Sequence, residues 1–194
     1  HLGIPYTTFH TKDLFDKLIE PPFGALFDTN INKLVERKLR EVVNGEIIYD
    51  NREKDYIVKK DQGSSVPIRN TDSGIKVFGI LQLLSSNDFI NKKSLLVFDE
   101  PENHLHPKWQ LKLAEILIDL AEQGVYILVS SHSPYMIEAL KRYSDLAGLE
   151  KESSFYLAKE NSIQNKDKLE EIFQVLSEPF EVFRKMDREI LKDE

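Results

Sequence analysis

The chain has 194 residues, 41% of them hydrophobic, and a formal net charge of −7. This length allows one good core, as a single domain or a portion of one, and the absence of cysteine excludes a disulfide framework and a thiolate metal site. No apolar run approaches a membrane span, and the first residues lack the pattern of a signal peptide, so we expect a cytoplasmic protein. The acidic balance argues weakly against a general nucleic-acid-binding surface.

The first 70 residues predict two helices and a small antiparallel sheet. Apolar residues at helical spacing indicate a helix over 11–20, which Pro21 and Pro22 end, and a second over about 30–43, which Asn44 and Gly45 end. The period then changes, and we expect three short strands at 46–49, 56–59 and 66–69. We interpret these elements as structural scaffolding and their basic residues as a solvated face rather than a DNA site.

Residues 70–84 predict a buried helix whose first turn is suited to an anion. Thr71, Asp72 and Ser73 are candidates for the N-cap, and Gly74 permits close approach of another backbone. The free N–H groups and the dipole at a helix start both favour phosphate. On local sequence alone, an ordinary capped core helix is the favoured alternative.

A short apolar run, Leu95 to Phe98, predicts a strand buried on both faces of a parallel sheet. Two adjacent carboxylates, Asp99 and Glu100, follow at its carboxyl end, the edge at which open α/β sheets bind ligands. A buried carboxylate without a partner is costly, and a Mg²⁺ ion carrying nucleotide phosphates would use this pair. Taken alone, the pattern also fits a strand that ends in solvated acids.

The next elements bring a histidine to the same edge. Pro107 can open a helix, apolar residues recur at helical spacing after it, and Gly124 can end it. A second apolar strand, 125–129, then runs into SSHSP, which contains His132. In a strand–helix–strand unit with the usual crossover, His132 reaches the edge that carries the two carboxylates.

Together, LLVFDEPENHLHP and YILVSSHSP resemble the Walker B and switch-histidine segments of ABC-type ATPases. They are closer to the stand-alone AAA/OLD-like and RecF/SMC-like ATPases than to transporter subunits, because the EPENHLHP continuation differs from the usual transporter run. The resemblance implies that Asp99 is the Walker B acid holding Mg²⁺ through water, Glu100 the catalytic glutamate and His132 the γ-phosphate sensor. It also places residues 101–107 in the D-loop, which communicates across a dimer.

The resemblance extends to the helix start at Ser73 and Gly74. Its position upstream of the Walker B-like strand corresponds to the family's signature motif, which transporters carry as LSGGQ. Asp72 and Ile75 depart from the transporter form, and Lys76 fits the stand-alone ATPases better. In the family this motif reads the γ-phosphate of ATP on the other subunit, so Ser73, Gly74 and Lys76 are expected to bind nucleotide in trans.

The rest of the chain receives no chemical role. We expect a helix over about 134–142, a strand over 155–158, and two closing amphipathic helices over 169–176 and 180–190. We see no acidic cluster of the kind that an appended metal-dependent nuclease domain would need. His104 and His106 suggest a metal site, but these two ligands lack companions, and a loop role is favoured.

The fold class expected from the resemblance is α/β, a partial P-loop NTPase fold of ABC type with a parallel-sheet core. Residues 1–92 form its helical and antiparallel-β portion with the signature motif, and residues 93–194 its carboxyl-terminal ATPase lobe. No glycine begins a G-x-x-x-x-G-K-[ST] phosphate loop, and the chain opens at His1 without Met. We therefore expect the carboxyl-terminal portion of an ABC-class ATPase, which is inactive when isolated.

Three functions remain open from the sequence. The leading one is an ATPase that uses ATP and Mg²⁺ as a head-to-tail homodimer, in DNA repair or phage defence, with a nucleic acid or an effector protein as a further partner. The alternatives are a non-hydrolytic binding or regulatory module completed by another chain, and a transporter nucleotide-binding subunit. The DSGIK signature and the HLHP continuation disfavour the transporter.

Overall fold

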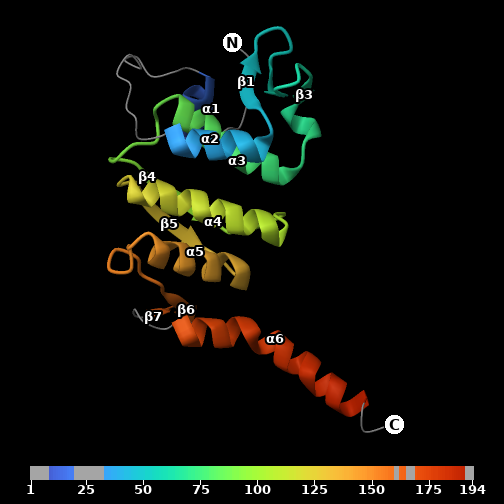
Figure 1. Cartoon of the computed structure of the whole chain (residues 1–194), viewed down its shortest axis with the longest axis vertical. Helices are drawn as coiled ribbons and strands as arrows, with labels where there is room; N and C mark the ends of the chain where they lie inside the picture. Colours follow the sequence, from blue (N-terminus) through green and yellow to red (C-terminus); the bar gives the residue numbers. More distant parts are fainter. Residues whose placement is uncertain (1–8, 20–32, 160–161, 165–168, 191–194) are drawn as a thin grey trace.

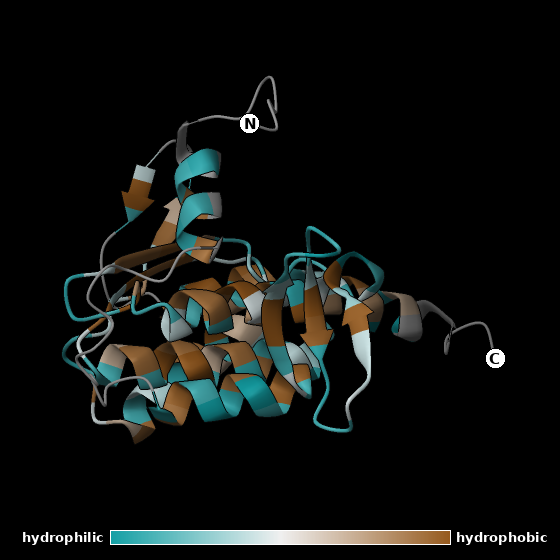
Figure 2. Ribbon diagram, turned by 90° about the horizontal axis from the view of Figure 1, so that it is seen from above, coloured by the Kyte–Doolittle hydropathy of each residue, from teal (hydrophilic) through white to brown (hydrophobic). Residues whose placement is uncertain are grey.

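The computed structural model describes residues 9–19, 33–159, 162–164 and 169–190. Its elements follow one another down the long axis of the molecule, with α6 at the far end (Figure 1). In chain order they are α1 (Phe9–Ile19), α2 (Lys33–Val43), β1 (Glu46–Asp50), β2 (Asp55–Lys59), β3 (Ser65–Pro67), η1 (Ile68–Asn70), α3 (Ser73–Ser86), β4 (Leu95–Asp99), α4 (Pro107–Glu122), β5 (Tyr126–Ser130), α5 (Pro134–Leu146), β6 (Leu157–Lys159), β7 (Ser162–Gln164) and α6 (Leu169–Ile190). Brown and teal alternate along the helices in Figure 2, as expected for elements that bury one face.

The predicted antiparallel meander is confirmed, with β2 pairing to β1 on one side and β3 on the other. Gly45 directly precedes β1 and has φ +152°. A Cβ at this position would lie 2.4 Å from the carbonyl oxygen of Lys59, so only glycine fits. Gln82 of α3 anchors the sheet. Its Oε1 accepts the N–H of Ile47 at 2.8 Å, and its Nε2 donates to the carbonyl of Gly45 at 3.2 Å.

Helix α4 is at the centre of the hydrophobic core. Its inward side chains are fully buried: Leu113, Ala114, Ile116, Leu117 and Leu120. Figure 1 shows α2 and α3 above α4 and α5 below it. One continuous cluster of buried side chains runs from Val35 on α2 through α4 to Ala139 on α5. Residues of both expected portions, 1–92 and 93–194, thus share this core, and the division between them stays a prediction.

A partly buried group of charges fastens α2 to α4. Nζ of Lys38 lies 2.8 Å from Glu115 and 2.5 Å from Asp119. Burial alone would lower the pKa of Lys38, but the hydrogen bonds to the two carboxylates outweigh it and raise that pKa above the ordinary 10.5. Burial would likewise raise the pKa of Glu115, yet hydrogen bonds from Lys38 and Lys112 hold it below the ordinary 4.5.

The predicted strand–helix–strand unit is present, and β4 and β5 pair in parallel. Figure 1 shows α4 and α5 on one side of the two strands. The prediction that β4 is buried on both faces is wrong, because the described residues cover only one face. On that face Leu96 and Phe98 pack against the core, whereas the other face leaves four side chains 57–68% exposed: Leu95, Val97, Tyr126 and Leu128. We call these four the bare sheet face.

The structure corrects three other predicted elements. Residues 68–70 form a 3₁₀ turn instead of continuing a strand, because Pro67 has no N–H to extend the ladder. The strand expected over 155–158 is β6, which begins two residues later, at Leu157, and pairs antiparallel with β7. The two closing helices are one helix, α6, with Pro179 inside it. Proline in a helix interior removes one hydrogen bond and kinks the helix, and α6 changes direction part-way along in Figure 1.

No helix in the described part of the chain is both long and apolar enough to cross a membrane.

Candidate active site at the carboxyl edge of the parallel sheet

The register of β4 and β5 brings polar residues from two strand ends together. Asp99, the last residue of β4, pairs with Ser130, the last of β5. The Ser130 hydroxyl donates a hydrogen bond to Oδ1 of Asp99, and the main-chain N–H of Glu100 donates to the carbonyl oxygen of Ser130 at 3.0 Å. The two strand ends are therefore tied to each other at the edge that carries both predicted carboxylates.

Glu100 and His132 meet at this edge, as the sequence predicts. Nε2 of His132 lies 3.0 Å from Oε1 of Glu100, and Nδ2 of Asn103 donates to the other carboxylate oxygen at 2.8 Å. The side chain of His132 is 85% exposed and that of Glu100 39% exposed. Glu100 is thus oriented through both oxygens and still open to a ligand from solvent.

Glu102 joins the turn after β4 to the turn after β5. It is only 8% exposed, and its Oε1 accepts three hydrogen bonds: from the Ser131 hydroxyl at 2.6 Å, the N–H of His132 at 2.8 Å and the N–H of Ser133 at 3.1 Å. Its Oε2 is buried without a hydrogen-bond partner among the described residues. By holding the backbone of His132, Glu102 fixes the place from which the imidazole reaches Glu100.

The predicted signature residues lie against the predicted D-loop of the same chain. The Ser73 hydroxyl is 3.4 Å from the carbonyl oxygen of His104, and a Cβ on Gly74 would lie 2.8 Å from Cδ2 of Leu105. Lys76 lies on the first turn of α3. Within the described ranges, no hydrogen bond or ion pair joins Ser73, Gly74 or Lys76 to the acids and histidine of the strand edge.

His106 has a structural role at the start of α4. It is the N-cap residue, and its Nδ1 accepts the N–H of Lys108 at 3.2 Å. His104 has a left-handed backbone, with φ +65°. The loop role predicted for the two histidines agrees with these positions.

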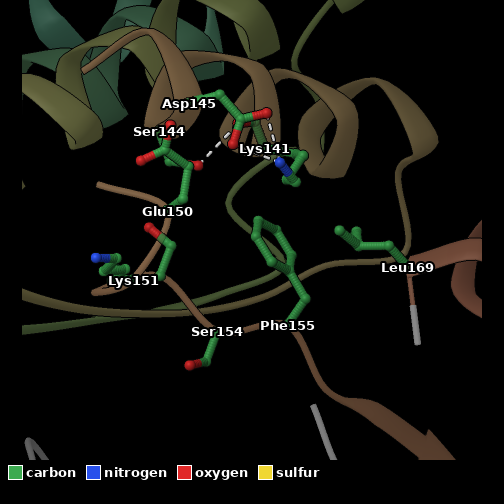
Figure 3. A pocket seen from close by; sticks show the side chains of 9 residues that line it. Lys141, Ser144, Asp145, Glu150, Lys151, Ser154, Phe155 and Leu169 are labelled. Carbon is green, nitrogen blue, oxygen red and sulfur yellow. Dashed lines mark hydrogen bonds and ion pairs between the residues drawn. The ribbon is translucent and has the colours of Figure 1, made fainter. Parts of the chain in front are cut away.

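A pocket of about 270 Å³ lies at the other end of α5 from His132 (Figure 3). Phe155 projects into its centre, and Lys141 pairs with Asp145 across its wall. Asp145 lies eleven positions after Pro134 on α5, which separates the two by roughly 16 Å. This pocket is therefore distinct from the strand edge, and Lys141 and Asp145 in its wall neutralise each other.

Residues 12–137 match the family model of the AAA ATPase domain, and this match covers well over half of the chain. The chain belongs to the AAA ATPase domain family. The matched region contains Ser73, Gly74, Lys76, Asp99, Glu100 and His132.

This AAA ATPase domain resembles parts of three curated proteins. It is 33% identical to protein ea59 of Escherichia phage lambda over 98 residues, which are 50% of this chain and 16% of ea59. It is 29% identical to the Old nuclease of Escherichia phage P2 over 96 residues, 49% of this chain and 16% of that protein. It is 34% identical to the lantibiotic transport ATP-binding protein SrtF of Streptococcus pyogenes over 91 residues, 46% and 38% of the two chains. The matched segment is thus about a sixth of the length of either phage protein.

A solved SMC ATPase, studied for its ATP-driven dimerization and DNA-stimulated activation, shares the fold. It aligns with 86% of this chain and 96% of its own at a TM-score of 0.52 and 13% identity. Together with the family match and the Old nuclease similarity, this likeness confirms an ABC-class ATPase domain of the AAA, OLD and SMC-like kind, with an α/β fold.

The AAA ATPase family implies that a nucleotide and Mg²⁺ bind. The strand edge fits Mg²⁺ only if nucleotide phosphates supply some of the ion's ligands. In the described part of the chain, no three Asp, Glu or His side chains are grouped to hold a metal by themselves. Mg²⁺ in nucleotide sites keeps several waters and takes one or two carboxylates together with phosphate oxygens. One carboxylate, Asp99, beside the Ser130 hydroxyl fits an ion that arrives with ATP.

Sequence reasoning missed three residues of this site: Glu102, Asn103 and Ser130. Each acts through a side-chain contact, and two of these contacts join residues about 30 positions apart. The sequence signal available for them was the cluster of polar residues that follows each strand, in DEPENH and in SSHS.

Proposed function

We propose that this AAA ATPase domain is the carboxyl-terminal catalytic part of an ATP-hydrolysing ABC-class ATPase that works as a head-to-tail dimer. The observation that carries the proposal is the 3.0 Å contact between Glu100 and His132, beside Asp99, at the carboxyl edge of the parallel sheet. Open α/β folds bind their ligands at this edge.

Each residue of the strand edge has a role in this proposal. Glu100, held by Asn103 and His132, accepts a proton from the water that attacks the γ-phosphate. His132 is exposed enough to contact that phosphate. Asp99, fixed by Ser130, would hold Mg²⁺ through water. When bound, the ion neutralises charge on the phosphate oxygens.

The proposal assigns the phosphate loop to sequence outside this chain, because none of its eight glycines begins the motif. The bare sheet face supports this assignment. Parallel strands are normally covered on both faces, and Leu95, Val97, Tyr126 and Leu128 present a continuous apolar surface to such a complement. The complement is either an upstream part of the same protein or another chain.

For the dimer, Ser73, Gly74 and Lys76 are proposed to bind the nucleotide of the other subunit. Two observations support a site in trans. The start of α3 has backbone N–H groups available to an anion, since Asp72 at its N-cap makes no side-chain capping bond. The same start lies on the predicted D-loop and, among the described residues, makes no polar contact with the strand edge of its own chain.

We propose DNA repair or phage defence as the process served, on the strength of the similarity to the Old nuclease of phage P2. A transporter subunit is the second candidate, favoured by the similarity to SrtF. The two differ in their activators, and stimulation of ATP hydrolysis by double-stranded DNA separates them.

The experiment that tests the central proposal is Glu100→Gln in the parent protein that also carries the phosphate loop. The change keeps the volume and much of the hydrogen bonding but removes the basic carboxylate, so turnover falls on the order of 10²–10⁴-fold while ATP still binds. The variant then accumulates as an ATP-bound dimer, which light scattering detects as a doubled mass.

Two companion variants sharpen this test. His132→Ala lowers kcat more than affinity, because it removes a transition-state contact, whereas Asp99→Asn weakens Mg-ATP binding itself. Wild-type turnover in Glu100→Gln removes Glu100 from the mechanism, whereas a parent protein that binds ATP and shows no turnover supports the non-hydrolytic alternative.

A further inference from the structure

A second buried polar side chain reaches the same turns as Glu102. Gln110, on the first turn of α4, is 8% exposed. Its Nε2 donates to the carbonyl oxygen of Leu105 at 2.9 Å, and its Oε1 accepts the hydroxyl of Ser133. A carbonyl oxygen can only accept, so the amide group has one possible orientation. Both ends of this side chain are therefore used, one on the predicted D-loop and one on the N-cap residue of α5.

These contacts close into a ring of four hydrogen bonds. Besides the two bonds of Gln110, the N–H of Ser133 donates to Oε1 of Glu102 at 3.1 Å, and the N–H of Leu105 donates to the carbonyl oxygen of Glu102 at 2.8 Å. All four residues are 6–9% exposed. Breaking one bond leaves two buried polar groups unpaired, so the ring resists opening. It thus fixes the segment 102–105 to the start of α5.

The place of Gln110 in the core makes its polarity notable. The next inward side chains of α4, Leu113, Ala114 and Leu117, are apolar and fully buried. A buried amide costs free energy unless its hydrogen bonds are made, and an apolar residue avoids that cost. What the amide supplies here is a fixed position for its two partners.

One of these partners is the neighbour of His132. The imidazole is 85% exposed, so its place depends mainly on the backbone that carries it. Glu102 holds the N–H of His132, and Gln110 holds the side chain of Ser133, the next residue. The turn that presents the imidazole is therefore fixed from two directions.

We infer that Gln110 is a positioning residue for the reaction at the strand edge. Through Ser133 it fixes the backbone from which His132 reaches Glu100. Through Leu105 it fixes the turn on which the start of α3 rests. This inference rests on the proposed function and extends it to a residue of α4 that touches neither the nucleotide nor the reacting carboxylate.

Gln82 offers a matched control. It is also a buried glutamine, 4% exposed, and it also makes two hydrogen bonds. Its partners, Gly45 and Ile47, belong to the antiparallel sheet rather than to the strand edge. Methionine is unbranched and close to glutamine in length, so Gln110→Met and Gln82→Met each remove one buried amide with little change of volume.

The first test is the kinetics of the parent protein that carries the phosphate loop. Gln110→Met lowers kcat by roughly 10²-fold, the cost of misplacing a catalytic group by about 1 Å. The KM for ATP stays near the wild-type value, because the lost contact acts on the chemical step. Gln82→Met leaves kcat unchanged. A wild-type kcat in Gln110→Met, or an equal fall in both variants, overturns the inference.

The second test is native-state amide exchange of the 194-residue chain, without nucleotide. In Gln110→Met the N–H groups of His132 and Ser133 exchange about tenfold faster, because the turn opens more often. Gln82→Met accelerates exchange at Ile47 instead, since Gln82 accepts that N–H. Unchanged exchange at His132 and Ser133 in Gln110→Met overturns the inference whatever the parent protein does.

A third variant breaks the same bond from its other side, so the outcome does not depend on the folding of Gln110→Met. Ser133→Ala removes the hydroxyl that Gln110 accepts and lowers kcat to a similar extent. The double variant falls no further than the lower single variant, because the two changes remove one shared bond. Additive losses show that Gln110 does not act through Ser133.

The failure of this inference is distinguishable from the failure of the proposed function. A Glu100→Gln protein with collapsed turnover beside a fully active Gln110→Met protein overturns the inference alone. Wild-type turnover in Glu100→Gln overturns the proposed function, and amide exchange then still decides whether Gln110 holds the turn of His132.

Discussion

Glu100 adopts a left-handed backbone conformation, φ +47°, directly after the last residue of β4. For a residue with a Cβ this conformation costs roughly 1–2 kcal/mol. It persists because the N–H of Glu100 is bonded to Ser130 and its carboxylate is bonded to Asn103 and His132. Strain of this kind gathers at functional sites, and here it falls on the carboxylate that the proposed mechanism uses.

Glu102 gives the sharpest prediction at the scale of single residues. Glu102→Ala deprives three donors, on Ser131, His132 and Ser133, of their shared acceptor in a buried position. Leaving buried donors unpaired costs about 1–3 kcal/mol, so the free energy of unfolding in urea falls by that amount. Asn103→Ala, in the next position but exposed, leaves the stability close to that of the wild type. Equal stability of the two variants contradicts the role given to Glu102.

The site residues that lie just after a recognisable strand could be predicted from the sequence. Asp99, Glu100 and His132 each come directly after, or within a few residues of, a recognisable apolar run, and the parallel register brings them to one edge. Glu102 could not be found in this way. Its partners lie 29 to 31 residues away, and nothing in the local sequence reports a contact between two turns.

At the scale of elements, the attachment of α2 to α4 predicts a pH dependence. Glu115 has a lowered pKa in the folded chain, so its stabilisation is present above about pH 4.5 and is lost as the pH falls through the folded value. Lys38 has a raised pKa, so its share is present below about pH 10.5 and is lost as the pH rises through the folded value. The stabilisation from this group of charges is therefore greatest between these limits.

Lys38→Met weakens this pH dependence, because it leaves Asp119 without its cation and Glu115 with Lys112 alone. The expected loss is about 1–3 kcal/mol at neutral pH, less than for a fully buried pair because solvent still reaches these side chains. Urea unfolding followed between pH 3 and 7 measures both effects. Arg40→Met, also on α2 but in an exposed pair with Asp61, leaves the profile unchanged. A profile for Lys38→Met as steep as that of the wild type contradicts this account.

The start of α3 carries a second prediction at this scale. In the parent protein, Ser73→Arg places a long cation at the proposed trans site, where it blocks the approach of the other subunit. We expect hydrolysis to stop while each subunit still binds ATP, measured by calorimetry on the monomer. Loss of nucleotide binding by the monomer shows instead that Ser73 acts in its own subunit.

Most elements were predictable because their periods were long and their ends were marked. Helix α4 begins at Pro107 and is followed by Gly124, and the two residues after α2, Asn44 and Gly45, have positive φ. The interpretation of α6 as two helices failed because Pro179 is a strong local signal. In the structure, Ile172 anchors the first half of the helix, and the apolar side of the helix is continuous. The sequence alone does not show that these features outweigh the proline.

At the scale of the whole molecule, the bare sheet face and the proposed external phosphate loop predict the behaviour of the isolated chain. Without that loop most hydrogen bonds to the nucleotide phosphates are absent, and Mg²⁺ loses its phosphate partners. We expect no ATP hydrolysis and at most weak nucleotide binding by the 194-residue chain. Calorimetry that finds micromolar affinity for Mg-ATP contradicts the assignment of the loop to another segment.

The three hydrogen bonds to Glu102 have a consequence for how the two turns move. The segment that begins at Pro101 and the turn that carries His132 are fastened at one oxygen atom, so neither shifts without the other. The start of α3 also rests on this segment, at His104 and Leu105. We therefore expect a displacement of the 103–106 turn to move the imidazole of His132 as well. A partner that binds to this surface would then change the rate of the reaction at Glu100.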